Sequence, residues 1–490
     1  MSDGPARLTA EQIDARTPAG RNRYADALRL TSIVVVVLGH WLLAVVSARG
    51  GRLEGVNLLA LHDGTHWLTW IFQVMPLFFF VGGYANAAAY RSARRRGVGW
   101  ADWVRGRARR LLRPVVPLVV LWTPVVGVLA VLGVPRSMLQ FASQVAIVPV
   151  WFLAAYLVVC AVVPLTYPLH ERFGAGMLAA MVGVAVAVDV AHLAGVPSVG
   201  WSNYVWIWGA VHQAGYLWHD ADRVAADTLA TATRAVSPQA SDVRASARWF
   251  PHTSASAVGV ALCGYGMLVV LTQVLDYPIS MVGVDGATRS NNSPPSVALL
   301  ALAAGQVGMA LALRRRCECL LARPRVWATV AMTGAFTMTV YLWHQTAMIV
   351  VAAALVPTGI WPSRENVDLT WWLTRPLWWL ACAVVLAGLV ALFGRYEHAG
   401  TTRSRPSTIR AAVGVSLATI GLGLLVFGGL HRPGTLTGVP WAPLGMLVVG
   451  LGALGVLRRP HRPDRLPEPG GVAEPVEVTP PDSEDASSPH

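Results

Sequence analysis

The chain has 490 residues, of which 54% are hydrophobic and only 13% are charged, and its formal net charge is +13. Because soluble proteins average about 25% charged residues, this composition excludes an ordinary soluble domain. The apolar residues recur in continuous stretches of about 20, the length that crosses a hydrocarbon layer roughly 30 Å thick, and they do not alternate as barrel strands do. The sequence therefore predicts an all-α polytopic membrane protein.

About twelve apolar segments follow one another along the chain, and we predict a transmembrane helix for each. They are 28–48, 67–90, 112–133, 149–169, 174–196, 201–219, 255–276, 296–313, 327–356, 371–393, 410–430 and 440–457. The sixth segment is the most polar, so we expect it to face the interior of the bundle.

Arginines supply all the basic charge of Lys and Arg, and they gather in alternate connections between the predicted helices. The strongly basic segments are 1–27, 91–111, 314–325, 394–409 and 458–465. By the positive-inside rule, these segments predict a protein of the cell membrane with both termini in the cytoplasm. The rule also explains the positive charge better than nucleic-acid binding does.

The two ends of the chain differ from the membrane region in composition. Residues 1–27 are polar and are predicted to form a cytosolic segment. Residues 458–490 are rich in proline and acidic side chains, which cannot bury enough apolar surface to fold. We predict a disordered cytosolic tail there.

The first predicted helix contains a histidine, His40, eleven positions after Arg29. Eleven residues complete about three helical turns and rise about 16 Å, so both side chains share one face. Asp26 lies almost one turn before Arg29 and is expected to orient its guanidinium. This arrangement suits a long substrate that is anionic at one end and reactive at the other, as acyl-CoA is. The alternative is that Arg29 anchors the helix end and that His40 is a packing residue.

A second arginine group precedes the third predicted helix, in the segment RGRARRLLRPVVPL of residues 105–118. Arg107, Arg110 and Arg113 are three positions apart, a spacing that favours one side of a helix. Arginine binds phosphate through two parallel hydrogen bonds, so the group is a candidate phosphate site. Taken alone, it is also compatible with an ordinary basic loop.

Further short motifs lie in other predicted helices. The second contains FFFVGGYANA (78–87), the fourth VWFLAAYL (150–157) and the ninth YLWH (341–344). Together with the two arginine patterns, and in this order, they resemble the integral-membrane acyltransferases of acyltransferase family three. Gly82 stands where that family usually has serine, so no hydroxyl role is assigned to this position.

The resemblance implies a catalytic core of ten helices over residues 28–397, followed by two additional helices in 398–457 that we expect the core to tolerate losing. It also implies transfer of an acyl group, often acetyl, from cytosolic acyl-CoA to a hydroxyl of a carbohydrate, lipid or secondary metabolite. Acyl-CoA is then a substrate, and we expect no permanently bound cofactor and no metal ion. The residues alone leave open a proton-coupled transporter of a small anionic or sugar-like solute.

The family's Arg-ten-His pattern falls on Arg29 and His40, and its Arg-x-x-Arg pattern falls on Arg110 and Arg113. His40 is predicted to be the general base that takes the proton of the acceptor hydroxyl; a covalent acyl-histidine is the alternative. The resemblance implies that these three arginines and Arg107 hold the phosphates of CoA.

Four further residues are candidates for supporting roles. Asp26 is expected to orient an arginine, and His344 is expected to bind the acceptor or to serve as a packing histidine. Tyr341 and Trp151 lie in the family motifs and are predicted to support the site or contact the acceptor, with helix packing as the alternative.

Overall fold

The structure, a computed structural model, describes residues 8–18, 20–49, 52–231, 250–251, 253–361, 367–397, 407–432 and 438–457. These residues are mostly helical, with one short hairpin, which confirms the all-α prediction. The predicted acidic tail and the centre of the long polar connection after residue 231 lie outside the described residues.

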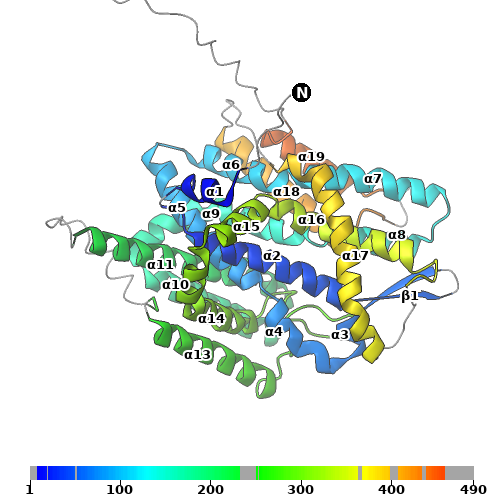
Figure 1. Cartoon of the computed structure of the whole chain (residues 1–490), viewed down its shortest axis with the longest axis horizontal. Helices are drawn as coiled ribbons and strands as arrows, with labels where there is room; N and C mark the ends of the chain where they lie inside the picture. Colours follow the sequence, from blue (N-terminus) through cyan, green and yellow to red (C-terminus); the bar gives the residue numbers. More distant parts are fainter. Residues whose placement is uncertain are drawn as a thin grey trace, which may run out of the picture.

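The helices and strands follow in chain order (Figure 1). The first half contains α1 (Ala10–Ala15), α2 (Arg23–Leu43), β1 (Ala44–Arg49), β2 (Arg52–Asn57), α3 (Leu58–Leu61), η1 (Asp63–Leu68), α4 (Thr69–Phe72), α5 (Met75–Arg95), α6 (Trp100–Leu112), α7 (Val115–Val131), α8 (Arg136–Ile147), α9 (Val150–Phe173), α10 (Ala175–Leu193), η2 (Pro197–Ser202) and α11 (Asn203–Thr231). The second half contains α13 (Ser254–Gln273), α14 (Val297–Leu321), α15 (Pro324–Gly334), α16 (Thr337–Leu355), α17 (Leu369–Phe393), η3 (Gly394–Tyr396), α18 (Thr408–Gly428) and α19 (Trp441–Ala453).

Within the described ranges, nine helical segments are long and apolar enough to cross a membrane, or ten if the bent pair α6 and α7 forms one span. Each of the twelve predicted segments coincides with a helix, but two fall short of these criteria. Helix α11 is long enough but too polar, and α19 has only 13 residues. The count of about twelve is therefore higher than length and composition support.

Two predicted spans have the wrong internal structure. The span 28–48 stops at Leu43, and the chain continues as an antiparallel hairpin in which Ala44 of β1 pairs with Asn57 of β2. Val45 and Val46 favour a strand, and a short apolar run does not distinguish helix from strand by its periodicity. The span 327–356 is divided into α15 and α16 after Gly334.

Helix α2 occupies the middle of the bundle, where it contacts α5, α14, α15, α16 and α17 (Figure 1). Most of its inward residues are apolar and buried, including Ile33, Val36 and Val37. This central position places the two ends of α2, with Arg29 near one and His40 near the other, against different sets of helices.

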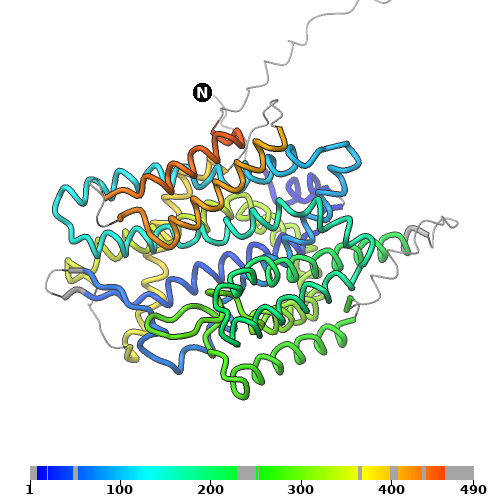
Figure 2. The backbone as a smooth tube through the Cα atoms, turned by 180° about the vertical axis from the view of Figure 1, so that it is seen from behind, coloured from blue at the N-terminus to red at the C-terminus, as the bar shows by residue number. Residues whose placement is uncertain are grey.

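The two C-terminal helices run side by side and cover one flank of the bundle (Figure 2). Helix α18 packs against α9, α8 and α6 as well as against α19. The helices predicted as an addition to the core are thus in direct contact with core helices. The domain boundaries themselves stay a prediction.

Candidate active site

His40 and His344 meet near the end of α2. Nδ1 of His40 lies 2.8 Å from Nε2 of His344, although 304 residues separate them in the chain. His344 is fully buried in α16, and Trp41 donates from its indole nitrogen to the carbonyl oxygen of His344 at 3.0 Å. The sequence predicted both histidines separately but not their contact.

The hydrogen bonds of His344 determine which nitrogen of His40 is free. Nδ1 of His344 lies 2.6 Å from the carbonyl oxygen of Tyr341, and a carbonyl oxygen only accepts, so this nitrogen carries the proton. A neutral His344 then has its lone pair on Nε2, which accepts from Nδ1 of His40. A neutral His40 is therefore left with its lone pair on Nε2. This is the atom that can take a proton from a substrate.

His40 lines a cavity of about 1100 Å³. Its walls come from α2, α7, α8, α9 and α16, from the β1–β2 hairpin, from the loop around residues 282–293, and from α18. Most lining side chains are apolar, with polar groups at a few positions that include Gln73, Asn292 and Thr419. A cavity of this size holds one small molecule whose reactive group reaches His40.

Three of the predicted arginines form one positively charged group. The charges of Arg107 and Arg29 both repel that of Arg110, although Arg29 is on α2 and the other two are on α6. Arg107 also lies over the ring of Trp103, with its guanidinium carbon 4.2 Å from the ring centre. Within the part of the chain that the structure describes, neither Arg107 nor Arg110 forms an ion pair with a carboxylate.

Arg113 is the fourth of the predicted arginines. It caps the end of α6, and its charge acts on Arg109, which is buried together with Arg105. Arg105 packs beside Gly455, just beyond the end of α19. Helix α6 therefore presents Arg107 and Arg110 toward α2, while Arg105 lies toward the C-terminal end of the described chain.

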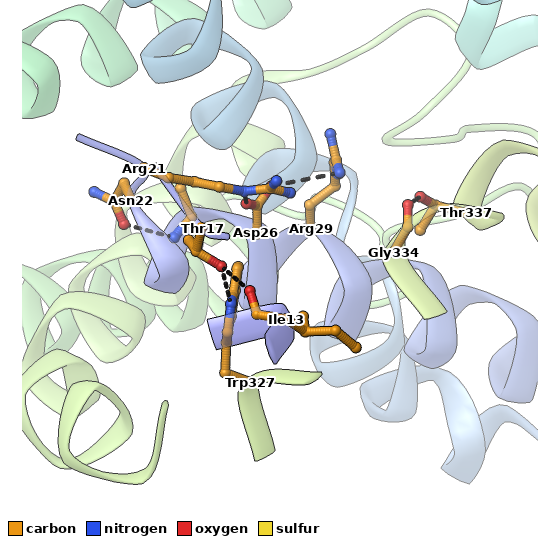
Figure 3. A network of polar contacts seen from close by, with 10 residues as sticks. Ile13, Thr17, Arg21, Asn22, Asp26, Arg29, Trp327, Gly334 and Thr337 are labelled. Atoms are coloured by element: carbon orange, nitrogen blue, oxygen red, sulfur yellow. Dashed lines mark hydrogen bonds and ion pairs between the residues drawn. The ribbon is translucent and has the colours of Figure 1, made fainter. Parts of the chain in front are cut away.

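Asp26 contacts Arg29, as the sequence predicted, but it does not serve Arg29 alone. One carboxylate oxygen lies 3.4 Å from Arg29 and the other lies 2.6 Å from Arg21 (Figure 3). In the same region, the indole nitrogen of Trp327 donates to the hydroxyl of Thr17 at 2.7 Å. The N-terminal segment thus packs against α15 and helps to fix the N-terminal end of α2.

Tyr341 and Trp151 both line the cavity. The hydroxyl of Tyr341 donates to the carbonyl oxygen of Pro149 at 2.9 Å, and its own carbonyl oxygen accepts from His344. Trp151 is half-buried, with its ring edge-on to that of Tyr204 on α11. The backbone of Tyr341 therefore positions His344, whereas Trp151 forms part of the wall.

Gly82 has a packing explanation. A Cβ atom on Gly82 would lie 2.7 Å from the hydroxyl oxygen of Tyr156, closer than such atoms approach one another. Tyr156 belongs to the VWFLAAYL motif, and its hydroxyl accepts from the side-chain amide of Asn86 at 3.3 Å. The tyrosine hydroxyl thus occupies the space that a larger residue at position 82 would fill.

Tyr156 belongs to a buried polar cluster that sequence reasoning missed. The amide nitrogen of Asn86 also lies 3.0 Å from Nε2 of His212 and 3.3 Å from the sulfur of Cys160. The charge of Arg107 acts on Tyr156, Cys160 and His212. The amide oxygen of Asn86 is buried and has no partner among the described residues. The signal in the sequence was the presence of Asn86 and His212 inside predicted helices.

Aromatic rings connect this cluster to the histidine pair. The ring of Tyr156 stacks on Phe152 at 5.5 Å between centres, and Phe152 lies edge-on to Tyr341 at 5.7 Å. Tyr341 in turn holds His344 through its carbonyl oxygen. The arginine group, the polar cluster and the histidine pair therefore follow one another along the axis of the bundle.

The chain matches a known protein family. The model of acyltransferase family three, described as an acyltransferase domain, matches residues 22–394. No curated protein and no solved structure matches the chain.

Proposed function

Because the chain belongs to acyltransferase family three and is a multi-pass membrane acyltransferase, we propose that it transfers an acyl group, most simply acetyl, from acyl-CoA to a hydroxyl group. His40 is the general base of this reaction, and the acceptor is a carbohydrate, a lipid or a secondary metabolite. The observation that carries the proposal is the hydrogen-bond chain from the Tyr341 carbonyl through His344, which leaves Nε2 of His40 unprotonated.

The reaction needs one proton to move twice. Nε2 of His40 takes the hydroxyl proton as the acceptor oxygen attacks the thioester carbonyl carbon. The carbon–sulfur bond then breaks, an ester forms, and the leaving thiolate takes the proton back from the imidazolium to give free CoA. His344 accepts a hydrogen bond from Nδ1 of His40 throughout, and so keeps the ring in one orientation.

The donor is assigned to the arginine group. The charges of Arg29 and Arg107 repel that of Arg110, and neither Arg107 nor Arg110 has a carboxylate partner among the described residues. Arg29 shares Asp26 with Arg21. An anionic phosphate relieves the remaining repulsion. Arg113 is assigned a lesser role, because its charge acts on Arg109 instead. The amide-rich arm of CoA would then pass the polar cluster, where the unpartnered oxygen of Asn86 can accept a hydrogen bond.

The acceptor is assigned to the cavity beside His40. The hairpin and the loop around residues 282–293 line this cavity, and both connect helices at the end of the bundle opposite Arg29. With the basic segments in the cytoplasm of a cell-membrane protein, the donor enters from the cytosolic side and the acceptor from the outer side.

Purified protein in sealed vesicles tests the assignment. Acyl-labelled acetyl-CoA is supplied on the face of the basic segments and an impermeant alcohol on the other, and labelled ester is measured. We expect ester from the wild type and a rate lower by about 10²–10⁴ for His40→Ala, because a general base typically contributes this much. Equal turnover of a folded His40→Ala variant would refute the role of His40. Ester formed only when both substrates share the basic face would refute transfer across the membrane.

A further inference from the structure

Helix α18 follows the region that matches the family model, yet it lines the cavity that contains His40. The match ends at residue 394, whereas α18 covers Thr408–Gly428. Thr419, Gly423, Val426 and Phe427 line the cavity. Their spacing of four, three and one residues places them on one face of the helix. A part of the chain outside the family domain thus contributes to the candidate active site.

Specific contacts hold this face of α18 in place. The side-chain amide of Gln144 on α8 donates to the carbonyl oxygen of Phe427 at 3.2 Å. The backbone N–H of Leu430, just after α18, donates to the hydroxyl of Ser143 at 3.1 Å. The ring of Phe427 lies edge-on to Trp201, with 6.0 Å between their centres. These contacts fix the C-terminal end of α18 against helix α8 and the η2 turn.

Two positions on the same face can interact with a bound molecule: Thr419 through a hydrogen bond, and Gly423 through the space beside it. The hydroxyl of Thr419 is buried and has no hydrogen-bond partner among the described residues. A buried polar group without a partner is unfavourable, and a bound ligand that offers one relieves this cost. At Gly423, a Cβ atom would meet none of the described atoms within 4 Å, so the cavity extends up to the helix backbone there.

The other lining groups indicate what kind of molecule fits. The wall of the cavity consists mainly of apolar side chains such as Leu121, Val125, Val158 and Ile349. A free sugar would leave many of its hydroxyl groups without partners against such a surface, at a cost for each. An alcohol with an apolar body loses little by entering.

We propose that α18 is the specificity wall of the acceptor site, and that it selects an alcohol with a predominantly apolar body. Gly423 provides room for that body, and Thr419 hydrogen-bonds to a polar group on it. The inference rests on the proposed function, since it names the acceptor class of the same site. It adds a role for helices that lie outside the family domain.

Photo-crosslinking tests the wall without requiring turnover. A fatty alcohol that carries a diazirine is added to protein in nanodiscs, and the labelled peptides are mapped. We expect labelling on α18 between Thr419 and Phe427, and a decrease of about tenfold in Gly423→Leu, whose side chain fills the cavity. Gly445→Leu is the matched control, because Gly445 on α19 is exposed and has equal room for a side chain. Labelling that is absent from α18, or that falls equally in both variants, overturns the inference.

The transfer assay separates this inference from the proposed function. Octanol, hexadecanol and glucose are compared as acceptors of label from acetyl-CoA. We expect the alcohols to exceed glucose in kcat/KM, and Gly423→Leu to reduce the value for hexadecanol more than that for octanol. Thr419→Val is expected to raise KM for a long-chain diol, whose second hydroxyl Thr419 can meet, with little change in kcat, and to leave hexadecanol unchanged. A higher kcat/KM for glucose than for the alcohols, or the same acceptor preferences in all variants, overturns the proposal that α18 selects the acceptor. Labelling of α18 without ester from any acceptor would instead contradict the proposed function.

Discussion

Replacement of His344 by alanine tests how the histidine pair works. The change removes the group that accepts from Nδ1 of His40 at 2.8 Å. A buried donor left without a partner costs about 1–3 kcal/mol. Without His344, the proton of His40 can also move to Nε2, which gives the other tautomer. If this cost appears in the transition state, the rate decreases roughly 5–150-fold, since each 1.36 kcal/mol is a factor of ten. His40→Ala should have the larger effect, because it removes the proposed base itself.

The double variant provides the stricter test. His344 acts through His40, so we expect His40→Ala/His344→Ala to be no slower than His40→Ala alone. Single-turnover formation of labelled ester is measured at saturating acetyl-CoA, with the KM for acetyl-CoA as a second readout that should not change. His192→Ala, which removes a histidine that contacts the carbonyl oxygen of Pro197 instead, is the control. Losses that add in the double variant would refute the reasoning and give His344 a separate role.

Three further changes probe the arginines, the polar cluster and the C-terminus. Arg110→Ala should raise the KM for acetyl-CoA about 10–150-fold, the equivalent of one charge-assisted phosphate contact of roughly 1.5–3 kcal/mol. Arg113→Ala should raise this KM less. Equal effects of the two changes, or no effect beyond that of the exposed control Arg325→Ala, would contradict the assignment. Gly82→Ala should lower the thermal unfolding midpoint because its Cβ meets Tyr156, and Gly82→Ala/Tyr156→Leu should be more stable than the sum of the two single changes by about 1–3 kcal/mol; simple additivity would show that the contact is unimportant. Deletion of 466–490 should leave turnover unchanged. Deletion of 398–490 should abolish acceptor use, because α18 lines the cavity. Acceptor use that survives the larger deletion would show that α18 and α19 are dispensable.

The membrane architecture was largely predictable because it depends on local composition. Every predicted span contains a helix, since stretches of about 20 apolar residues are typical of little else. Composition did not reveal where a helix stops within an apolar run. Residues 44–48 are as apolar as the segment before them, yet Val45 and Val46 belong to a strand because the hairpin pairs them with β2. That pairing is a tertiary contact, which helical periodicity does not contain.

The candidate site was predictable residue by residue but not as an arrangement. The spacing of Arg29 and His40 is a property of one helix and could be calculated. The contact between His40 and His344 joins helices that are far apart in the chain, and only packing brings them together. The role of Arg113 stays a prediction, and its charge acts on Arg109. The cavity wall from α18 was not predicted, because only tertiary packing against α8 and α9 brings α18 to the cavity.

The early end of α2 also has an electrostatic consequence. The peptide dipoles of a helix sum to a partial negative charge at its C-terminal end. His40 lies in the last turn of α2. If His40 is the base, as proposed, the positive charge that it gains with the hydroxyl proton develops close to that end. Such a contact stabilises a cation by about 0.3–1 kcal/mol, and by up to ~2 kcal/mol where it is partly buried. Had α2 continued to residue 48, its negative end would lie about 7.5 Å further away, so the hairpin places the helix terminus next to the ring that the proposed mechanism protonates.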